Sequence, residues 1–268
     1  MGLYIITKEA ALETNRRFGK KVFFLEASPL EAVDVNVEEE FVLANMIAAG
    51  MREKERQIFK NLSGMLTSSM LSDILDEFDL NGVISGLKLN LQEKKIMGYA
   101  KTLKLKKLEE GEDYRSIYDA LKSYNTIIPH DIILVENECH EYAYFGELNA
   151  SLAIRHGAIG AIIGGMTRDT AEVSKLDFPV FSTGSNCKDV RKRAGLESIN
   201  REIEIFGVKV SAGDLIFADN DGVIVIPSQF QDQVISRALE TIEKEKNILL
   251  NITMGNDQMK LLEDNGEF

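Results

Sequence analysis

The sequence contains few of the residues that build disulfide frameworks, zinc sites or hinges. Its two cysteines, Cys139 and Cys187, belong to no CxxC pair and to no zinc-ligand spacing, so we expect reduced thiols that hold no metal. Its four prolines are too few to mark a hinge. The first twenty residues lack the apolar stretch of a signal peptide or a membrane-spanning helix. We therefore expect a cytoplasmic protein that does not engage a membrane.

Basic residues are also in deficit. The 268 residues include 31 Lys and Arg against 43 Asp and Glu, which gives a formal net charge of −12. Binding to nucleic acid requires a basic face that neutralises phosphates, so this balance argues against a nucleic-acid-binding protein. With 44% hydrophobic and 28% charged residues, the composition is that of a folded globular protein rather than a disordered one.

The chain divides by composition into an N-terminal extension and a remainder. Residues 1–62 are charged, helix-biased and poor in glycine, and we predict a long amphipathic helix over 35–62 that is interrupted at Gly50. A second helix should follow Thr67 or Ser68, either of which can cap it. We therefore assign a mainly helical extension (1–62), a main domain (63–257) and a C-terminal tail (258–268). Within the main domain, strands are favoured over 84–105, a helix over 111–123 and a last helix over 228–252.

The middle of the chain predicts a strand–helix–strand unit. An apolar run at 132–135 predicts one buried strand and residues 158–163 predict another, while Gly146 precedes a helix that Gly157 would end. Strands joined in this way are parallel, with a right-handed crossover. Farther on, apolar alternation around residues 220–222 (Asn-Asp-Gly) predicts a β-hairpin with positive φ in its turn. The sequence thus indicates an α/β fold.

Two charged residues, Arg168 and Asp169, follow the second of these strands, and Glu147 opens the helix that follows the first. Carboxyl ends of parallel strands share one edge of a sheet. The helix-start amides and these two side chains should therefore face one crevice, the usual ligand position in open α/β sheets. An arginine fork and helix-start amides can hold one carboxylate from two sides. Asp169, a hard oxygen donor, could then carry Mg²⁺ or Mn²⁺.

Each of these residues also has a purely structural explanation. Adjacent unlike charges in a loop are commonly solvated, which would account for Arg168 and Asp169 without a ligand. A carboxylate in the first turn of a helix is favoured by the helix dipole, which would account for Glu147. The functional alternative for Glu147 is a group that transfers a proton or orients water beside the metal. Burial decides between these two interpretations.

Other kinds of active site find little support. The three histidines, His130, His140 and His156, lack a metal-ligand spacing such as HxxxH. The sequence has no GxSxG elbow for Ser-His-Asp catalysis, and its glycines between 157 and 165 reproduce neither GxGxxG nor a P-loop. Residues 219–222 begin like a calcium loop, but the later glutamate ligand is absent, so a hairpin turn is the better interpretation.

Several stretches between about residues 66 and 255 match one known family. They are LTSSMLSDILD, GYAKT, FGELNASLAIRHGAIGAIIGGMTRD, FPVFSTG and GVKVSAGDLIFADNDGVIVIP. On these stretches the sequence resembles the RraA-like family, which contains the regulator of ribonuclease activity A and class II pyruvate aldolases. Those aldolases cleave 4-hydroxy-4-methyl-2-oxoglutarate and 4-carboxy-4-hydroxy-2-oxoadipate. The most specific element is Gly146-Glu147 followed by Arg168-Asp169 at the family's spacing.

The resemblance implies a swivelling β/β/α domain, here with an N-terminal helical extension, assembled as a homotrimer or a dimer of trimers with active sites between subunits. It implies that Arg168 and the helix start hold the carboxylate of pyruvate, and that Asp169 binds the metal mostly through waters. Glu147 would assist proton transfer through water. Glu245 of a neighbouring subunit would support the water shell, and Glu243 is close enough to compete. The helix-start residues that correspond to the family's carboxylate site are Gly146, Leu148 and Asn149.

The activity that the resemblance implies is that of a metal-dependent carbon–carbon lyase. It would cleave a 4-hydroxy-2-oxo acid to pyruvate and decarboxylate oxaloacetate as a companion reaction, since both reactions leave a pyruvate enolate that Mg²⁺ or Mn²⁺ can stabilise. The alternative is a non-catalytic protein that regulates a ribonuclease by contact. A third possibility is a lyase or isomerase that acts on a sugar acid, because an arginine and a metal serve any 2-oxo carboxylate.

Overall fold

The fold is that of a computed structural model, which describes residues 5–24, 26, 28–30 and 32–255. The chain divides into two compact units, Met1–Glu55 and Arg56–Phe268. We expected a boundary near residue 62, which lies in the same helix, Glu38–Met65, seven residues after the last residue of the first unit. The expected tail 258–268 lies outside the described residues.

The first unit contains α1 (Lys8–Thr14) and the first half of α2 (Glu38–Met65). Thr7 caps α1, and the carboxylate of Glu40 accepts hydrogen bonds from the amides of Asn36 and Val37 at the start of α2. The predicted interruption at Gly50 is wrong, because α2 continues through it. One glycine costs a helix interior only about 1 kcal/mol relative to alanine, and Gly50 has at least twelve helical residues on either side.

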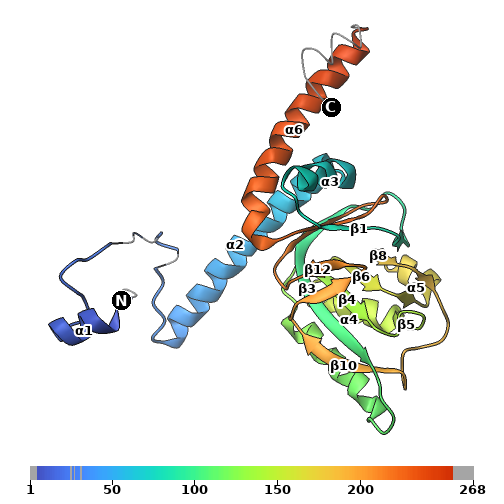
Figure 1. Ribbon diagram of the computed structural model, residues 1–268, viewed down its shortest axis with the longest axis horizontal. Coiled ribbons are helices and arrows are strands. Elements are labelled where there is room, and N and C mark those ends of the chain that lie inside the picture. Colours follow the sequence, from blue (N-terminus) through green and yellow to red (C-terminus); the bar gives the residue numbers. More distant parts are fainter. Residues whose placement is uncertain (1–4, 25, 27, 31, 256–268) are drawn as a thin grey trace. The chain divides into compact units, whose positions relative to one another are not determined.

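The second unit is built on a curled, nine-stranded mixed sheet in the order β1-β14-β13-β3-β4-β6-β8-β2, with β10 also paired to β3. The long strand β3 joins two parts of this sheet (Figure 1). Its first residues pair antiparallel with β13, and its later residues pair parallel with β4. The strands are β1 (Val83–Ile84), β2 (Lys88–Leu89), β3 (Ile96–Lys107), β4 (Ile132–Asn137), β6 (Gly160–Gly164), β8 (Val180–Ser182), β10 (Ala194–Ile199), β13 (Leu215–Ala218) and β14 (Val223–Ile226).

Two smaller sheets and several helices complete this unit. The sheets are the hairpin of β11 (Ile203–Ile205) and β12 (Val208–Val210) and the three-stranded parallel sheet of β5 (Ala143–Phe145), β7 (Met166–Thr167) and β9 (Gly184–Ser185). The α-helices are α3 (Ser68–Glu77), α4 (Glu147–His156), α5 (Thr170–Lys175) and α6 (Gln231–Thr253), with 3-10 turns η1 (Tyr114–Thr126) and η2 (Ser228–Phe230).

Three buried apolar clusters hold these layers together. The first lies between β4, β6 and β8 and the elements η1, α4 and α5. The second lies between β13 and β14 and the helices α3 and α6, which lie side by side (Figure 1). The third is enclosed by the curled sheet and the β11–β12 hairpin. The helices α4 and α6 therefore belong to different clusters.

The strand–helix–strand prediction is confirmed, since β4 and β6 pair in parallel around α4. Gly157 ends α4 in the left-handed conformation, at φ 93°. The helix after Thr67 is also confirmed, because the Thr67 hydroxyl accepts a hydrogen bond from the amide of Met70. The segment expected as a helix over 111–123 forms instead as 3-10 turns in η1.

The hairpin of β13 and β14 is confirmed, but the positive φ predicted for its turn is wrong. The carboxylate of Asp219 organises this turn by accepting a hydrogen bond from the amide of Asp221. The backbone amide of Asp219 donates to the carbonyl of Gly222. Side-chain hydrogen bonding of this kind closes a turn without a left-handed residue.

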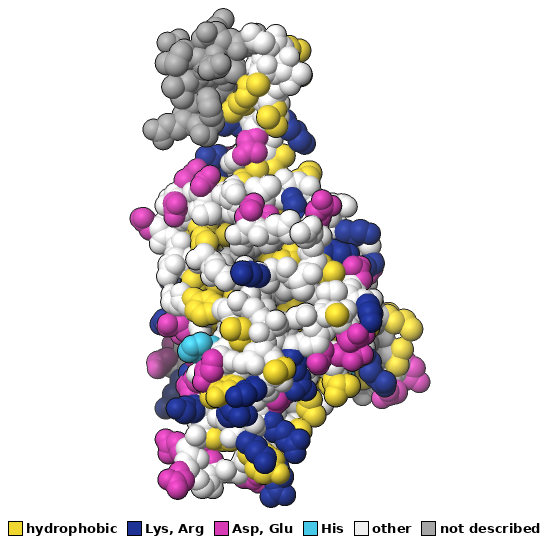
Figure 2. All heavy atoms as spheres, turned by 90° about the vertical axis from the view of Figure 1, so that its right-hand side faces the viewer, with side chains coloured by type: hydrophobic (Ala, Val, Ile, Leu, Met, Phe, Trp, Pro, Cys, Tyr) yellow, Lys and Arg dark blue, Asp and Glu magenta, His cyan; other side chains and the backbone are white. Residues whose placement is uncertain are grey.

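The helices and one face of the surface can be compared with those of a membrane-spanning or strongly charged protein. Among the residues that the structure describes, none of the helices is both long and apolar enough to cross a membrane. Figure 2 shows one face on which acidic and basic side chains are interspersed, with Lys and Arg side chains most frequent in its lower half. That face therefore carries charges of mixed sign.

Candidate functional site

The candidate site lies where the parallel strands of the main sheet end. Each of β4, β6 and β8 is followed by a short strand, β5, β7 or β9, and these three short strands pair in parallel. The carbonyl of Phe145 in β5 accepts hydrogen bonds from the Thr167 hydroxyl at 2.6 Å and from the Arg168 amide at 2.9 Å. These bonds fix the loop that carries Arg168 against the loop that leads into α4.

Gly146 is the point of closest approach between the two loops. A Cβ atom at this position would lie 2.5 Å from Oδ2 of Asp169 and 3.0 Å from Cγ of Arg168. The φ of Gly146 is −151°, a value open to any residue, so it is the approach of the two side chains and not the backbone conformation that requires glycine. Arg168 and Asp169 thus lie directly against the N-terminus of α4.

Asp169 has an unusual backbone conformation. Its φ of 53° and ψ of 35° place it in the left-handed region, and it stands at the N-cap of α5 without a capping side-chain hydrogen bond. Its Oδ2 instead accepts a hydrogen bond of 3.4 Å from the amide of Glu147, at the start of α4. The same oxygen lies 3.5 Å from Nε of Arg168. The carboxylate is therefore aimed at the other helix, and it is 43% exposed.

The guanidinium of Arg168 is held by a residue that the sequence reasoning missed. Nη1 of Arg168 lies 2.8 Å from Oδ2 of Asp189, and both side chains are about one third exposed. Asp189 follows the third parallel strand and pairs with Ala143 in a parallel bridge. Because Asp189 follows the next parallel strand of the same sheet, the strand order also predicts it at the edge where Glu147 and Arg168 lie.

The other predicted residues lie as follows. Glu147 and Leu148 are exposed in the first turn of α4, and the Asn149 side chain donates a hydrogen bond to the carbonyl of Tyr144 at 2.8 Å. The first hydrogen bond within α4 runs from the amide of Ala150 to the carbonyl of Gly146. The amides of Leu148 and Asn149 precede that bond, at the end of the helix where amides have no acceptor in the helix itself.

The structure does not bring the last-helix glutamates to this cluster within one chain. Glu243 and Glu245 are exposed on α6, which packs against α3 and the second apolar cluster, whereas α4 and α5 belong to the first. The contribution of Glu245 from a neighbouring subunit stays a prediction.

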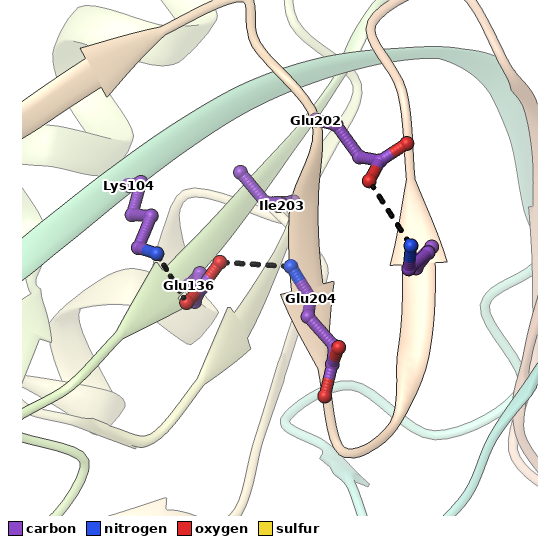
Figure 3. Close-up of a pocket in the computed structure, with 6 residues that line it drawn as sticks. Lys104, Glu136, Glu202, Ile203 and Glu204 are labelled. Carbon is purple, nitrogen blue, oxygen red and sulfur yellow. Dashed lines mark hydrogen bonds and ion pairs between the residues drawn. The ribbon is translucent and has the colours of Figure 1, made fainter.

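Two surface pockets lie near these elements. One, of about 350 Å³, is lined by Lys104, Glu136, Glu202, Ile203, Glu204 and Lys209 (Figure 3). Its charges pair with one another: Lys104 lies 3.2 Å from Glu136, and Glu136 accepts a hydrogen bond of 2.8 Å from the amide of Glu204. The neighbouring carboxylate of Glu136 raises the pKa of Lys104, so the lysine stays charged.

The second pocket, of about 360 Å³, lies beside the candidate site. Its lining includes Thr167 and Thr170, the residues that flank Arg168 and Asp169, and further hydroxyls on β8, β9 and α5. Lys88 supplies a positive charge. These hydroxyls and the Lys88 ammonium could bind polar groups of a ligand, while the rest of the lining is largely apolar.

Within the described part of the chain, the structure has no group of three or more His, Cys, Asp or Glu side chains arranged to hold a metal. A divalent cation at Asp169 would therefore have few protein ligands. Mg²⁺ binds in this way, since it keeps several of its waters and needs only one or two carboxylates. The donor set fits such a cation and does not fit a fully protein-coordinated metal.

Comparison with known proteins identifies relatives for most of the second unit. A family model described as RraA-like: Aldolase/RraA matches residues 70–225. Protein DlpA of Legionella pneumophila is 27% identical over 198 residues, which cover 74% of this chain and 32% of DlpA. The chain thus spans about a third of the length of that relative. A Halalkalibacterium halodurans protein named "Putative 4-hydroxy-4-methyl-2-oxoglutarate aldolase" is 28% identical over 65% of this chain and 78% of its own.

A solved structure shares the fold. Streptomyces coelicolor RraAS2, described as an unusual member of the RNase ES inhibitor RraA protein family, superposes with a TM-score of 0.62 at 21% identity, covering 71% of this chain and 94% of its own. The predicted swivelling α/β architecture is therefore confirmed for the second unit.

Proposed function

The chain belongs to the RraA-like family, and from that premise we propose that it is a divalent-metal-dependent class II pyruvate aldolase. Its substrate would be a 4-hydroxy-2-oxo acid that is cleaved to pyruvate, and decarboxylation of oxaloacetate would be a side activity. One observation carries the proposal: Arg168, Asp169 and the N-terminus of α4 meet at one solvent-accessible edge of the sheet. The aldolase name of the Halalkalibacterium relative supports the reaction class.

The carboxylate of the substrate would be bound by Arg168 and by the amides of Leu148 and Asn149. Asp189 engages Nη1 of Arg168 and Asp169 lies near Nε, so Nη2 and the second N–H of Nη1 remain for a bidentate contact. The helix-start amides add partial positive charge from the opposite side. Together they would fix the 2-oxo acid with its carbonyl near Asp169.

Asp169 is the residue that would hold Mg²⁺ or Mn²⁺. Its carboxylate is exposed, stands free of the capping role at α5 and points to the start of α4. The cation, when bound, supplies positive charge beside the substrate oxygen on which negative charge develops. Arg168, held by Asp189, would supply further positive charge from the protein itself.

Glu147 would move the proton. Cleavage requires a proton to leave the 4-hydroxyl group and another to reach the carbon that becomes the methyl group of pyruvate. Glu147 is exposed in the first turn of α4, a position that its interaction with the helix dipole would also explain. Its own amide contacts Asp169, and its carboxylate is open to water at this edge. Glu245 of a neighbouring subunit, in a homotrimer or dimer of trimers, would orient that water.

The proposal is tested by pyruvate release from oxaloacetate and from 4-hydroxy-4-methyl-2-oxoglutarate. Activity should require Mg²⁺ or Mn²⁺ and be lost with a chelator. Arg168→Ala should lower kcat/KM by about 100-fold or more, the usual effect of removing one aligned charge-stabilising donor. Arg155→Ala is the matched control, because Arg155 is exposed at the other end of α4. Equal turnover in the two variants would refute the site.

If the folded protein turns over no 2-oxo acid with either metal, the alternative is favoured, a non-catalytic regulator of a ribonuclease. The chain would then be a binding protein of the kind that the Streptomyces structure's description names, an RNase inhibitor.

A further inference from the structure

The first half of α2 carries an uncharged stretch, residues 41–51, that is largely exposed. On one face of the helix, Leu43 and Met51 are 51% and 50% exposed, while Ala44 and Ile47 are half-buried. Phe41 and Met46, at 52% and 66%, are exposed on other sides of the helix. A helix segment that is apolar on most sides is normally buried, and exposed apolar surface of this kind marks interfaces. The segment also lies outside residues 70–225 that the family model matches, so the proposed active site does not account for it.

One face of this segment combines small and large apolar residues. Leu43, Ala44, Ile47, Gly50 and Met51 follow the spacing of three and four residues that places side chains on one face of a helix. A Cβ atom added to Gly50 would meet nothing within 4 Å, so nothing in the described chain requires glycine there. Ala44 and Gly50 would let a second helix approach closely, since interaxial distance depends on the side chains at the contact.

Charges bound this face with opposite signs at its two ends. Glu40 lies on the face before Leu43, and Lys54 lies on it after Met51. Oε2 of the Glu40 carboxylate also accepts hydrogen bonds from the amides of Asn36 and Val37. Ile47 stands midway between Glu40 and Lys54. If two copies of the helix run antiparallel about Ile47, Glu40 lies opposite Lys54 of the second copy, Leu43 opposite Met51, and Ala44 opposite Gly50. A parallel arrangement would instead place Glu40 against Glu40 and Lys54 against Lys54.

We propose that α2 pairs antiparallel with α2 of a second copy of this chain, across a two-fold axis at Ile47. This contact is isologous, because each copy presents the same face. This pairing is separate from the proposed activity. It would double the number of chains in the assembly that residues 56–268 form by themselves. A trimeric catalytic unit joined in this way becomes a dimer of trimers.

The mass of the native assembly in solution tests whether the number of chains doubles. Light scattering on the full chain should give a mass for Ile47→Asp that is half that of the unaltered protein, whatever the number of subunits in the catalytic unit. Met46→Asp, one residue away and about 100° around the helix, should keep the full mass. Lys54→Glu, an exposed charge reversal that places two glutamates together, should weaken the pairing without changing the helix. Equal masses for the unaltered protein, Ile47→Asp and Lys54→Glu would overturn the proposal.

Disulfide trapping tests the antiparallel register. In a Cys187→Ser background, which removes the exposed native thiol, the double variant Leu43→Cys/Met51→Cys should crosslink two chains under mild oxidation. Each single cysteine should give little product, because a disulfide needs Cα atoms about 4.4–6.8 Å apart. Efficient crosslinking of either single variant, or none in the double variant, would contradict this register. Pyruvate release by all these variants should match that of the unaltered protein, which separates this proposal from the proposed function.

Discussion

At the scale of single residues, the candidate site combines a left-handed aspartate, a conformation that Asp79 and Asp177 share elsewhere in the chain, with a close approach at Gly146. Asp169 adopts a left-handed conformation that few L-residues take, and the side chains of Arg168 and Asp169 leave no room for a Cβ atom at Gly146. Strained conformations of this kind persist where the surrounding structure enforces them, and they cluster at functional sites. The strain at Asp169 directs its carboxylate to α4 rather than to its own helix.

Replacing Asp169 by glycine should therefore separate stability from activity. Glycine adopts the left-handed region without a Cβ penalty, so Asp169→Gly should leave the unfolding free energy unchanged or raise it by up to about 1 kcal/mol. Pyruvate release and Mg²⁺ binding should be lost. Asp79→Gly is the matched control, because Asp79 is an exposed aspartate with nearly the same φ, 54°, and it should keep activity. Urea titrations and calorimetric metal titrations measure the two quantities, and a marked loss of stability in Asp169→Gly alone would show that its carboxylate is structural.

Asp189 should act by positioning Arg168. Asp189→Asn removes the charge that faces Nη1 while keeping the shape of the side chain. If Arg168 binds the substrate carboxylate, KM should rise about tenfold, equivalent to about 1.4 kcal/mol, with a smaller change in kcat. Asp177→Asn, which removes an exposed aspartate paired with Lys94 at 2.7 Å, should leave both constants unchanged. A fall in kcat at constant KM would instead assign Asp189 a role in the chemical step.

At the scale of secondary-structure elements, one carboxylate joins the start of α3 to the β13–β14 turn. The buried side chain of Asp219 accepts hydrogen bonds from the Ser68 amide at 3.0 Å, the Ser68 hydroxyl at 2.6 Å and the Asp221 amide at 3.0 Å. Burial by itself would raise the pKa of Asp219, but these hydrogen bonds outweigh it and lower the pKa below its usual value. A carboxylate satisfied in this way stabilises both elements while it is ionised.

The pH dependence of stability follows from this lowered pKa. A group whose pKa is lower in the folded state stabilises the fold above its unfolded pKa, about 3.9 for aspartate, and loses that effect as the pH falls through the folded value. Asp219→Asn should therefore lower the unfolding free energy at pH 7 by about 1–3 kcal/mol, and the difference from the unaltered protein should shrink below about pH 4. Asp221→Asn, an exposed change in the same turn, is the control. A difference that persists undiminished at pH 3 would contradict the linkage.

Elements set by local pattern could be predicted from the sequence, and those set by distant contacts could not. The left-handed Gly157 and the Thr67 cap depend on residues within a few positions. The sequence therefore predicts α3, α4 and the parallel pairing of β4 and β6. The conformation of the 219–222 turn depends on Ser68, far away in the chain. The pairing of Asp189 with Arg168 depends on the order of three strands. The continuity of α2 through Gly50 shows that one glycine is a weak signal against a long helix.

At the scale of the whole molecule, two helical segments lie on either side of the matched family region in the sequence. Both the exposed half of α2 and the whole of α6 lie outside residues 70–225. The α6 helix packs with the second apolar cluster, while Arg168 and Asp169 adjoin α4 and α5, which pack in the first. If Glu245 serves the active site, it must therefore reach the site of another copy of the chain. That requirement makes the assembly part of the catalytic apparatus.

Subunit complementation tests this requirement. Arg168→Ala and Glu245→Gln should each be nearly inactive alone, but chains carrying one change each and coexpressed with different tags should form mixed assemblies in which some sites combine an intact Arg168 with an intact Glu245. In a closed ring with random order, about a quarter of the sites would be complete, so recovered pyruvate release should approach that fraction. Glu243→Gln tests the competing candidate on α6: it should keep full activity by itself if Glu245 is the residue that serves the site. If Glu245→Gln is inactive and the mixture recovers nothing, Glu245 acts within its own chain. Full activity of Glu245→Gln alone would remove this residue from the site and leave Glu147 as the group that handles the proton.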